Sequence, residues 1–170
     1  MSKEIIFETE HLLVRRLVLS DLTPFHVMES NPKVLQYATG EVKSLEAHEK
    51  ELEELIVKYS IPRNDFWIYA IERKSDLNFI GTIAFVKDNN GHNEIGYRFL
   101  EKYWKNGYGT EIVRGMVLYC KEMGLRSLMA YVAYENIASD KIIKKAGFTY
   151  LEDSFCEEAK VKERKYTLEL

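Results

Sequence analysis

The amino-acid sequence predicts one α/β (α+β) domain that spans residues 1–170 and is built around a mixed sheet. A length of 170 residues suits one domain of ordinary size. A hydrophobic content of 46%, with 11 Tyr and 8 Phe, is enough for a sizeable core. The expected elements follow the order strand, two helices, three strands, helix, strand, helix and two strands, which is typical of layered domains that combine helices with a sheet.

The first expected elements are one strand and two helices. Residues 11–18 predict a strand with Leu12, Val14 and Val18 on one face, and a pair of arginines interrupts this pattern. Ser20 is expected to cap a short helix that continues to residue 29 and stops before Asn31-Pro32. Residues 44–59 carry apolar side chains at helical spacing and predict a second, amphipathic helix.

Three strands are expected next, over residues 66–72, 79–86 and 92–99. The first of them is apolar on both faces, which indicates a central strand. The segment Asp88-Asn-Asn-Gly91 has the composition of a hairpin turn, so the second and third strands should pair directly.

The longest expected helix covers residues 107–123 and ends at Gly124. Its apolar side chains form one stripe, which is Ile112, Met116, Tyr119, Cys120 and Met123. A strand over 127–133 and a short helix over 136–146 follow, and residues 148–151 and 161–168 should close the sheet as an antiparallel pair.

Composition excludes several classes of protein. A net charge of −3 argues against a nucleic-acid partner. Two cysteines cannot form a disulfide framework, and the absence of a Cys/His cluster argues against a metal site. Neither a signal peptide nor a membrane-spanning segment is evident, so a cytoplasmic location is expected.

One cluster that could carry chemistry lies between the strand ending at Phe99 and the long helix. The loop Trp104-Lys-Asn-Gly-Tyr-Gly109 contains two glycines directly before the helix start. Glycines let a ligand approach the backbone closely, and helix-start N–H groups favour phosphate. Ile112 stands where a dinucleotide fingerprint needs its third glycine, so that motif is excluded. Taken alone, the loop is equally well explained as a turn without a ligand.

A second cluster begins at Asn136 and ends at Lys145-Ala-Gly-Phe148. Asn136 can cap the helix that follows, with Ser139 in its first turn, and Gly147 can end that helix. Taken alone, capping and burial explain this cluster.

Together the two clusters resemble the GNAT superfamily of N-acetyltransferases, in the branch that contains the ribosomal-protein (alanine) N-terminal acetyltransferases. Further matches to that branch are Glu8-Thr-Glu-His-Leu-Leu-Val-Arg-Arg-Leu17, Gly81 and Glu94-Ile-Gly-Tyr97. The resemblance covers nearly the whole chain. It implies a GNAT-like mixed, mostly antiparallel central sheet of about seven strands flanked by about four helices.

The resemblance also implies acetyl-CoA as the co-substrate, without a metal. In that family the pantetheine arm pairs with the fourth strand, here through the backbone of Tyr97, Phe99 and Leu100, and Asn136 reaches the same arm. The pyrophosphate would lie on the loop and helix start formed by Trp104, Lys105, Asn106, Gly107, Tyr108, Gly109 and Thr110.

The chemistry needs a base, an oxyanion donor and an acid. An amine with an ordinary pKa of ~10 must lose a proton before it attacks a thioester, and Glu94 on the fourth strand is the expected base. A backbone N–H near Phe99 is the expected oxyanion donor. The family often uses a Tyr as acid, but Ile143 stands at that position. The resemblance assigns the role to Ser139, with Tyr134 as the alternative.

The acceptor is expected to be a primary amine, either a protein N-terminus or a small amine such as a polyamine or an aminoglycoside. Six glutamates between residues 41 and 54 could attract a cation, or could be the solvated face of the second helix. A non-catalytic acyl-CoA-binding module remains the competing hypothesis. Either a monomer or a homodimer fits the sequence.

Overall fold

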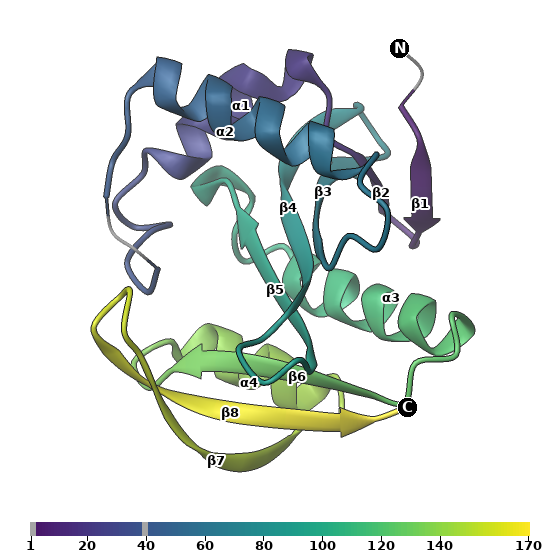
Figure 1. The fold of residues 1–170 in the computed structure, drawn as a ribbon, viewed down its shortest axis with the longest axis vertical. Coiled ribbons are helices and arrows are strands. Elements are labelled where there is room, and N and C mark those ends of the chain that lie inside the picture. Colours follow the sequence, from purple (N-terminus) through teal and green to yellow (C-terminus); the bar gives the residue numbers. More distant parts are fainter. Residues whose placement is uncertain (1–2, 39–40) are drawn as a thin grey trace.

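The computed structural model describes residues 3–38 and 41–170, which form a mixed sheet covered by helices on both faces (Figure 1). Over these residues the sheet has eight strands in the order β1-β2-β3-β4-β5-β6-β8-β7. The strands are β1 Ile5–Glu8, β2 Leu12–Arg16, β3 Phe66–Arg73, β4 Asn78–Lys87, β5 Asn93–Phe99, β6 Ser127–Ala133, β7 Thr149–Cys156 and β8 Val161–Glu169. The helices are α1 Leu22–Glu29, α2 Leu45–Lys58, α3 Tyr108–Glu122 and α4 Ile137–Lys145, with 3₁₀ turns at Leu19–Asp21 and Glu101–Tyr103.

The expected α/β architecture with four helices and a mostly antiparallel sheet is confirmed. The strand β1 was not expected, because the pairing of this short strand with β2 cannot be inferred from its four residues. The expected helix cap at Ser20 was wrong, because a 3₁₀ turn occupies this position and Asp21 precedes α1. Met123 was wrongly assigned to the apolar stripe of α3, because it lies beyond the helix and is 55% exposed.

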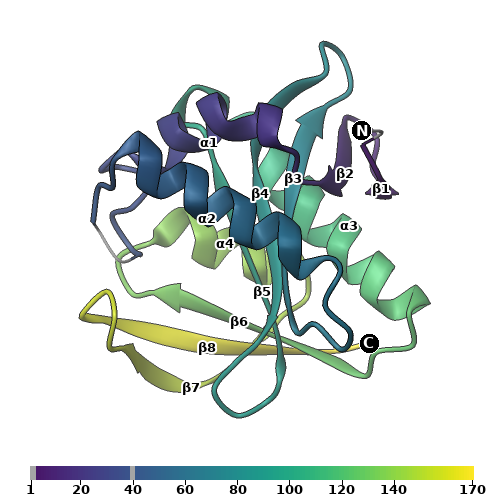
Figure 2. The same ribbon diagram turned by 45° about the horizontal axis from the view of Figure 1, so that its top comes forward.

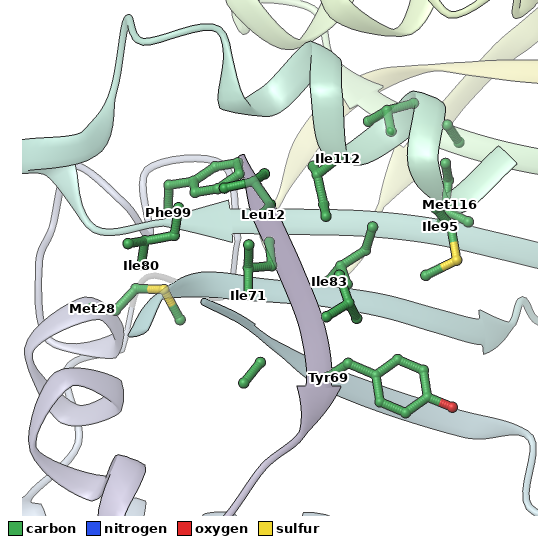
Figure 3. Packing of buried hydrophobic residues seen from close by; sticks show 14 of the residues in the cluster. Leu12, Met28, Tyr69, Ile71, Ile80, Ile83, Ile95, Phe99, Ile112 and Met116 are labelled. Atoms are coloured by element: carbon green, nitrogen blue, oxygen red, sulfur yellow. The ribbon is translucent and has the colours of Figure 1, made fainter. Parts of the chain in front are cut away.

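The helices divide between the two faces of the sheet (Figure 2). The α1–α2 pair covers one face, and Glu29 of α1 forms an ion pair with Arg98 of β5 at 2.7 Å. The opposite face packs against α3, whose Ile112 and Met116 are fully buried. Figure 3 shows these two side chains pointing toward Ile83 and Ile95 of the central strands. The apolar face of the amphipathic helix α3 is therefore the face that packs against the centre of the sheet.

The central parallel pair of strands, β5 and β6, separates along its length. Within the described part of the chain these strands share one register position, Glu94 opposite Met129. All other neighbouring strands pair antiparallel over longer stretches, seven positions for β4 with β5. The sheet therefore opens between β5 and β6 on the C-terminal side of Glu94 (Figure 1).

A buried arginine connects β2, β3 and the start of α1. Arg15 is 1% exposed, and its guanidinium donates two hydrogen bonds of 2.8 Å to the Asp21 carboxylate. Its Nε donates a third, of 2.7 Å, to Glu72. A buried cation is tolerated here because all of these contacts are charge-assisted. This arginine, which breaks the apolar pattern of residues 11–18, is thus an internal structural link.

We expect the substitution Arg15→Met to lower the free energy of unfolding by about 3–5 kcal/mol, because it leaves the buried Asp21 carboxylate without its cation and leaves Glu72 only its ion pair with Lys3. Lys33→Met is the matched control, since Lys33 is 68% exposed in its ion pair with Glu101 and should cost no more than ~1 kcal/mol. Urea unfolding followed by circular dichroism measures both. Equal losses for the two variants would contradict a stabilising role for Arg15.

Candidate active site

A cavity of about 600 Å³ lies against the sheet where β5 and β6 separate. One face of the sheet forms its floor, through side chains that alternate along each strand. The floor includes Ile68, Ala84, Glu94, Arg98, Tyr131 and Glu163. The α1–α2 pair and the start of α4 contribute further walls. Residues from almost every part of the chain therefore meet at this opening.

The opened edge of β5 exposes backbone groups. Leu100 N–H donates to Ile80 C=O at 2.9 Å, and hydrogen bonds alternate along an antiparallel pair. By this alternation the backbone groups of Arg98 point toward β4, whereas those of Tyr97 and Phe99 point toward β6 and the opening. The indole N–H of Trp104 donates a hydrogen bond of 2.9 Å to the Phe99 carbonyl. An extended ligand could therefore pair with β5 through the remaining groups.

The loop from Trp104 to Thr110 leads directly into α3. Gly107 is the N-cap residue of α3 and has a φ of +81°, a left-handed conformation that favours glycine. The Asn106 side chain donates to the carbonyls of Tyr103 and Trp104, both at 3.0 Å. The start of a 15-residue helix thus lies beside the opened edge of β5, an arrangement suited to an anion.

Gly109 has a different role from Gly107. A Cβ atom built at Gly109 would lie 2.7 Å from Cδ1 of Ile142 in α4, the end of a flexible side chain that would have to shift. A Cβ atom at Gly107 would meet nothing within 4 Å, so the left-handed backbone is what favours glycine there. The two glycines were expected to act together at the ligand, but in the structure Gly109 also lies at the α3–α4 contact.

Glu94, the expected base, lines the cavity at the point where the strands separate. The pKa of its carboxyl is raised from 4.5 to about 7. Burial is the main cause, the charges of Asp88 and Glu163 contribute to the rise, and Lys165 opposes it. Asp88 stays ionised: burial alone would raise its pKa, but hydrogen bonds that include one from Tyr131 hold it at about 2. A carboxyl with a pKa near neutrality is suited to general-base chemistry.

Ser139 and Asn136 lie together at the start of α4 and both line the cavity. The Asn136 side chain accepts a hydrogen bond of 3.1 Å from Ser139 N–H, which confirms the expected cap. The Ser139 hydroxyl lies 2.8 Å from the hydroxyl of Tyr97, whose pKa is raised by burial and lowered by this hydrogen bond, with a net rise.

Tyr134, the alternative acid, points elsewhere. Its hydroxyl donates to Asp153 of β7, and the Arg164 guanidinium lies 3.8 Å from its ring centre. Tyr134 is absent from the residues that line the cavity within the described part of the chain. The tyrosine hydroxyl that lies beside Ser139 belongs to Tyr97, which had been considered only for its backbone.

The cavity is rich in carboxylates, although few come from the expected acidic segment. Of the six glutamates between 41 and 54, Glu41 and Glu51 line it, and Lys43 pairs with Glu51 at 2.8 Å. The other lining carboxylates are Glu29, Glu94, Glu158 and Glu163. Glu163 and His48 were missed because residues distant in sequence face the same space only after folding.

Across residues 3–38 and 41–170, no group of three or more His, Cys, Asp or Glu is arranged to hold a metal ion. None of the helices in these segments is both long and apolar enough to cross a membrane.

We expect Gly109→Ala to lower the melting temperature slightly, because the new methyl group must displace the Cδ1 end of the Ile142 side chain at the α3–α4 contact. Adding Ile142→Val to this variant removes the Cδ1 atom in question and should recover most of the loss. Differential scanning calorimetry of the two single variants and the double variant measures the coupling. Additive losses would show that the two residues do not compete for space.

The raised pKa of Glu94 predicts a pH-dependent cost in stability. As the pH rises from 4.5 to about 7, the carboxyl ionises more readily in the unfolded chain, so the free energy of unfolding falls. Glu94→Gln removes this loss and should be about 1–3 kcal/mol more stable than the parent protein at pH 8, but not at pH 4.5. Urea unfolding at both pH values tests this, and a pH-independent difference would argue against a raised pKa.

Known proteins share this arrangement. The family model described as "Acetyltransferase (GNAT) domain" matches residues 11–149. The uncharacterized N-acetyltransferase YoaA of Bacillus subtilis (strain 168) is 30% identical over 147 residues, which are 84% of this chain and 82% of that protein.

Solved structures agree in fold. A GNAT-family acetyltransferase from Bacillus anthracis superposes with a TM-score of 0.81 at 24% identity, over 95% of this chain and 96% of that one. RimL, a ribosomal L7/L12 α-N-protein acetyltransferase in complex with coenzyme A, gives a TM-score of 0.82 at 19% identity over 98% of both chains. With its family model, its curated relative and its opened sheet in agreement, the chain belongs to the GNAT acetyltransferases, whose co-substrate is acetyl-CoA.

Proposed function

We propose that this N-acetyltransferase transfers the acetyl group of acetyl-CoA directly to a primary amine within a ternary complex, with Glu94 as the general base. The observation that carries the proposal is the position of Glu94, a carboxyl with a pKa of about 7 in the wall of the cavity where β5 and β6 separate. At neutral pH a substantial part of such a carboxyl is ionised and can accept a proton.

The acetyl donor is proposed to lie across the opened edge of β5. The backbone N–H and C=O of Tyr97, which point toward the opening, suit the amides of a pantetheine arm, and Asn136 lines the same cavity. The pyrophosphate would lie on the helix start, at the N–H groups from Lys105 to Thr110, where the helix dipole favours negative charge.

The acetyl transfer itself needs three groups. Glu94 removes a proton from the acceptor ammonium, and the neutral amine attacks the thioester carbonyl. The Phe99 N–H, directed at the opening, would stabilise the oxyanion of the tetrahedral intermediate. As that intermediate collapses, the thiolate would leave and take up the remaining proton of the amine nitrogen, so that free thiol and a neutral amide result. Of the two hydrogen-bonded hydroxyls of Ser139 and Tyr97, the one that accepts from the other would donate a hydrogen bond to the departing sulfur.

A peptide N-terminus or a small amine is the proposed acceptor. Carboxylates outnumber cations on the cavity wall, which attracts an ammonium group. The structural neighbour RimL is, by its name, a ribosomal-protein α-N-acetyltransferase, which supports a peptide acceptor at the level of analogy.

Release of free thiol from acetyl-CoA tests the proposal. The protein is incubated with acetyl-CoA and a panel of peptide amides, polyamines and aminoglycosides, and thiol is measured with a chromogenic disulfide. Release that depends on an amine supports the proposal. Tight binding of acetyl-CoA with no release for any amine would instead favour a non-catalytic acyl-CoA-binding module.

Glu94→Gln should lower turnover by roughly 10²–10⁴-fold, because glutamine keeps the size of the side chain but cannot accept the proton. The loss should be smallest at high pH, where free amine is abundant. Coenzyme A affinity, measured by calorimetry, should remain unchanged. A loss that is uniform across pH would assign Glu94 a structural role.

Ser139→Ala should slow turnover by about 10–150-fold, the effect of one hydrogen bond of ~1.5–3 kcal/mol to a charged sulfur. Tyr134→Phe is the matched control, since its hydroxyl is bonded to Asp153 and should be dispensable. Steady-state kinetics with one acceptor compares the two variants. Full activity in Ser139→Ala together with loss in Tyr134→Phe would transfer the acid role to Tyr134.

A further inference from the structure

A glycine in the middle of β5 has no local reason to be glycine. The φ of Gly96 lies outside the left-handed range, and a Cβ atom built on this residue would meet nothing within 4 Å. Neither backbone conformation nor packing therefore requires glycine here, although glycine weakens the interior of a strand. The free space above Gly96 belongs to the cavity, which this residue lines.

The free space above Gly96 lies on the α1–α2 face of the sheet. Side chains alternate along a strand, so Gly96 shares its face with Glu94 and Arg98. Arg98 pairs with Glu29 of α1 at 2.7 Å, whereas the neighbouring Ile95 faces α3 on the opposite side (Figure 3). A side chain at position 96 would therefore project into the cavity beneath α1 and α2.

An apolar row leads from this glycine across the sheet. In the strand register Gly96 lies opposite Ala84 of β4, and Ala84 lies opposite Ile68 of β3. These three residues, which form the apolar row, all line the cavity, as does Leu55 of α2. The row crosses two strand spacings, about 10 Å.

The neighbouring rows are different in character. On one side Val86 lies opposite Glu94, and on the other Thr82 lies opposite Arg98. These side chains are larger than those of the first two members of the apolar row. The cavity floor is therefore lowest along the apolar row, between a carboxyl on one side and a guanidinium on the other.

An acyl chain is the occupant that this row favours. The proposed base Glu94 and the proposed oxyanion donor Phe99 must both reach the reacting thioester, and Gly96 lies between them on β5. An ammonium group loses hydration over an apolar floor, whereas burial stabilises each methylene of a hydrocarbon chain. The apolar row therefore continues the donor site and not the acceptor site.

We propose that the apolar row holds the acyl chain of the donor, so that the enzyme binds and transfers acyl groups longer than acetyl, with Gly96 as the specificity-determining residue. The inference rests on the proposed function. The reaction is unchanged: the amine nitrogen forms a bond to the acyl carbon, and the thioester C–S bond breaks. One proton of the ammonium passes to Glu94 and a second to the thiolate, which leaves as free thiol.

The test measures binding in the absence of any amine. The protein is titrated by calorimetry with coenzyme A, acetyl-CoA and butyryl-CoA, which differ only in the acyl group. Gly96→Val places an isopropyl group at the start of the apolar row, where the structure has room for its Cβ atom. Ala38→Val is the matched control, because it places the same side chain on the cavity wall outside the row.

We expect the parent protein to bind butyryl-CoA about 10-fold more tightly than acetyl-CoA, since each buried methylene contributes a factor of roughly 3–4. Gly96→Val should abolish this difference and leave coenzyme A affinity unchanged, and Ala38→Val should retain it. The melting temperature of Gly96→Val should not fall, which shows that the variant is folded.

Equal affinities of the parent protein for the two thioesters would overturn the inference. A preference that persists in Gly96→Val, that disappears in Ala38→Val, or that is replaced by an equal loss of coenzyme A affinity would do the same. Thiol release with an amine is measured separately for both donors, and release from acetyl-CoA alone would also contradict the inference. The expected binding preference without release from either donor would count against the proposed function alone.

Discussion

The separation of β5 from β6 is the constraint on which the site depends. Parallel neighbours must be joined by a crossover, and α3 provides it between these two strands. Because the strands pair at Glu94 and Met129 and then separate, backbone groups that a regular sheet would satisfy internally face a cavity. The same crossover places the start of α3 at the open edge. One interruption in the sheet therefore creates both the ligand-pairing edge and the neighbouring anion site.

The acid–base properties of the cavity also follow from that interruption. Glu94 is the residue of β5 that pairs with β6, so the sheet partly buries it while it remains part of the cavity wall. Burial and the neighbouring charges of Asp88 and Glu163 disfavour its ionised form. The folded protein is therefore expected to be more stable above neutral pH when an amide replaces this carboxyl. Destabilised groups of this kind are common at functional sites, where activity and stability are in conflict.

The two layers of helices have separate tasks around the opening. On one face α3 and α4 pack together at Gly109 and Ile142, and α4 brings Ser139 to the hydroxyl of Tyr97. On the other face α1 and α2 are linked through His26 and His48. The hydroxyls proposed for the leaving sulfur and the carboxylate proposed as the base therefore come from opposite sides of the sheet, which suits a direct transfer between two bound substrates.

Local sequence determined most of the elements and several of their ends. The turn at Asp88-Asn-Asn-Gly91, the left-handed Gly107 and the Asn136 cap depend on contacts within a few residues, and each could be predicted from its own segment. The motifs likewise indicated the family, because their order along the chain is a property of the sequence. Tertiary structure decided which side chains meet. Strand register and contacts between distant residues place Tyr97 beside Ser139 and turn Tyr134 toward Asp153. They also create strand β1 and the burial that raises the pKa of Glu94. No single segment of the sequence carries this information.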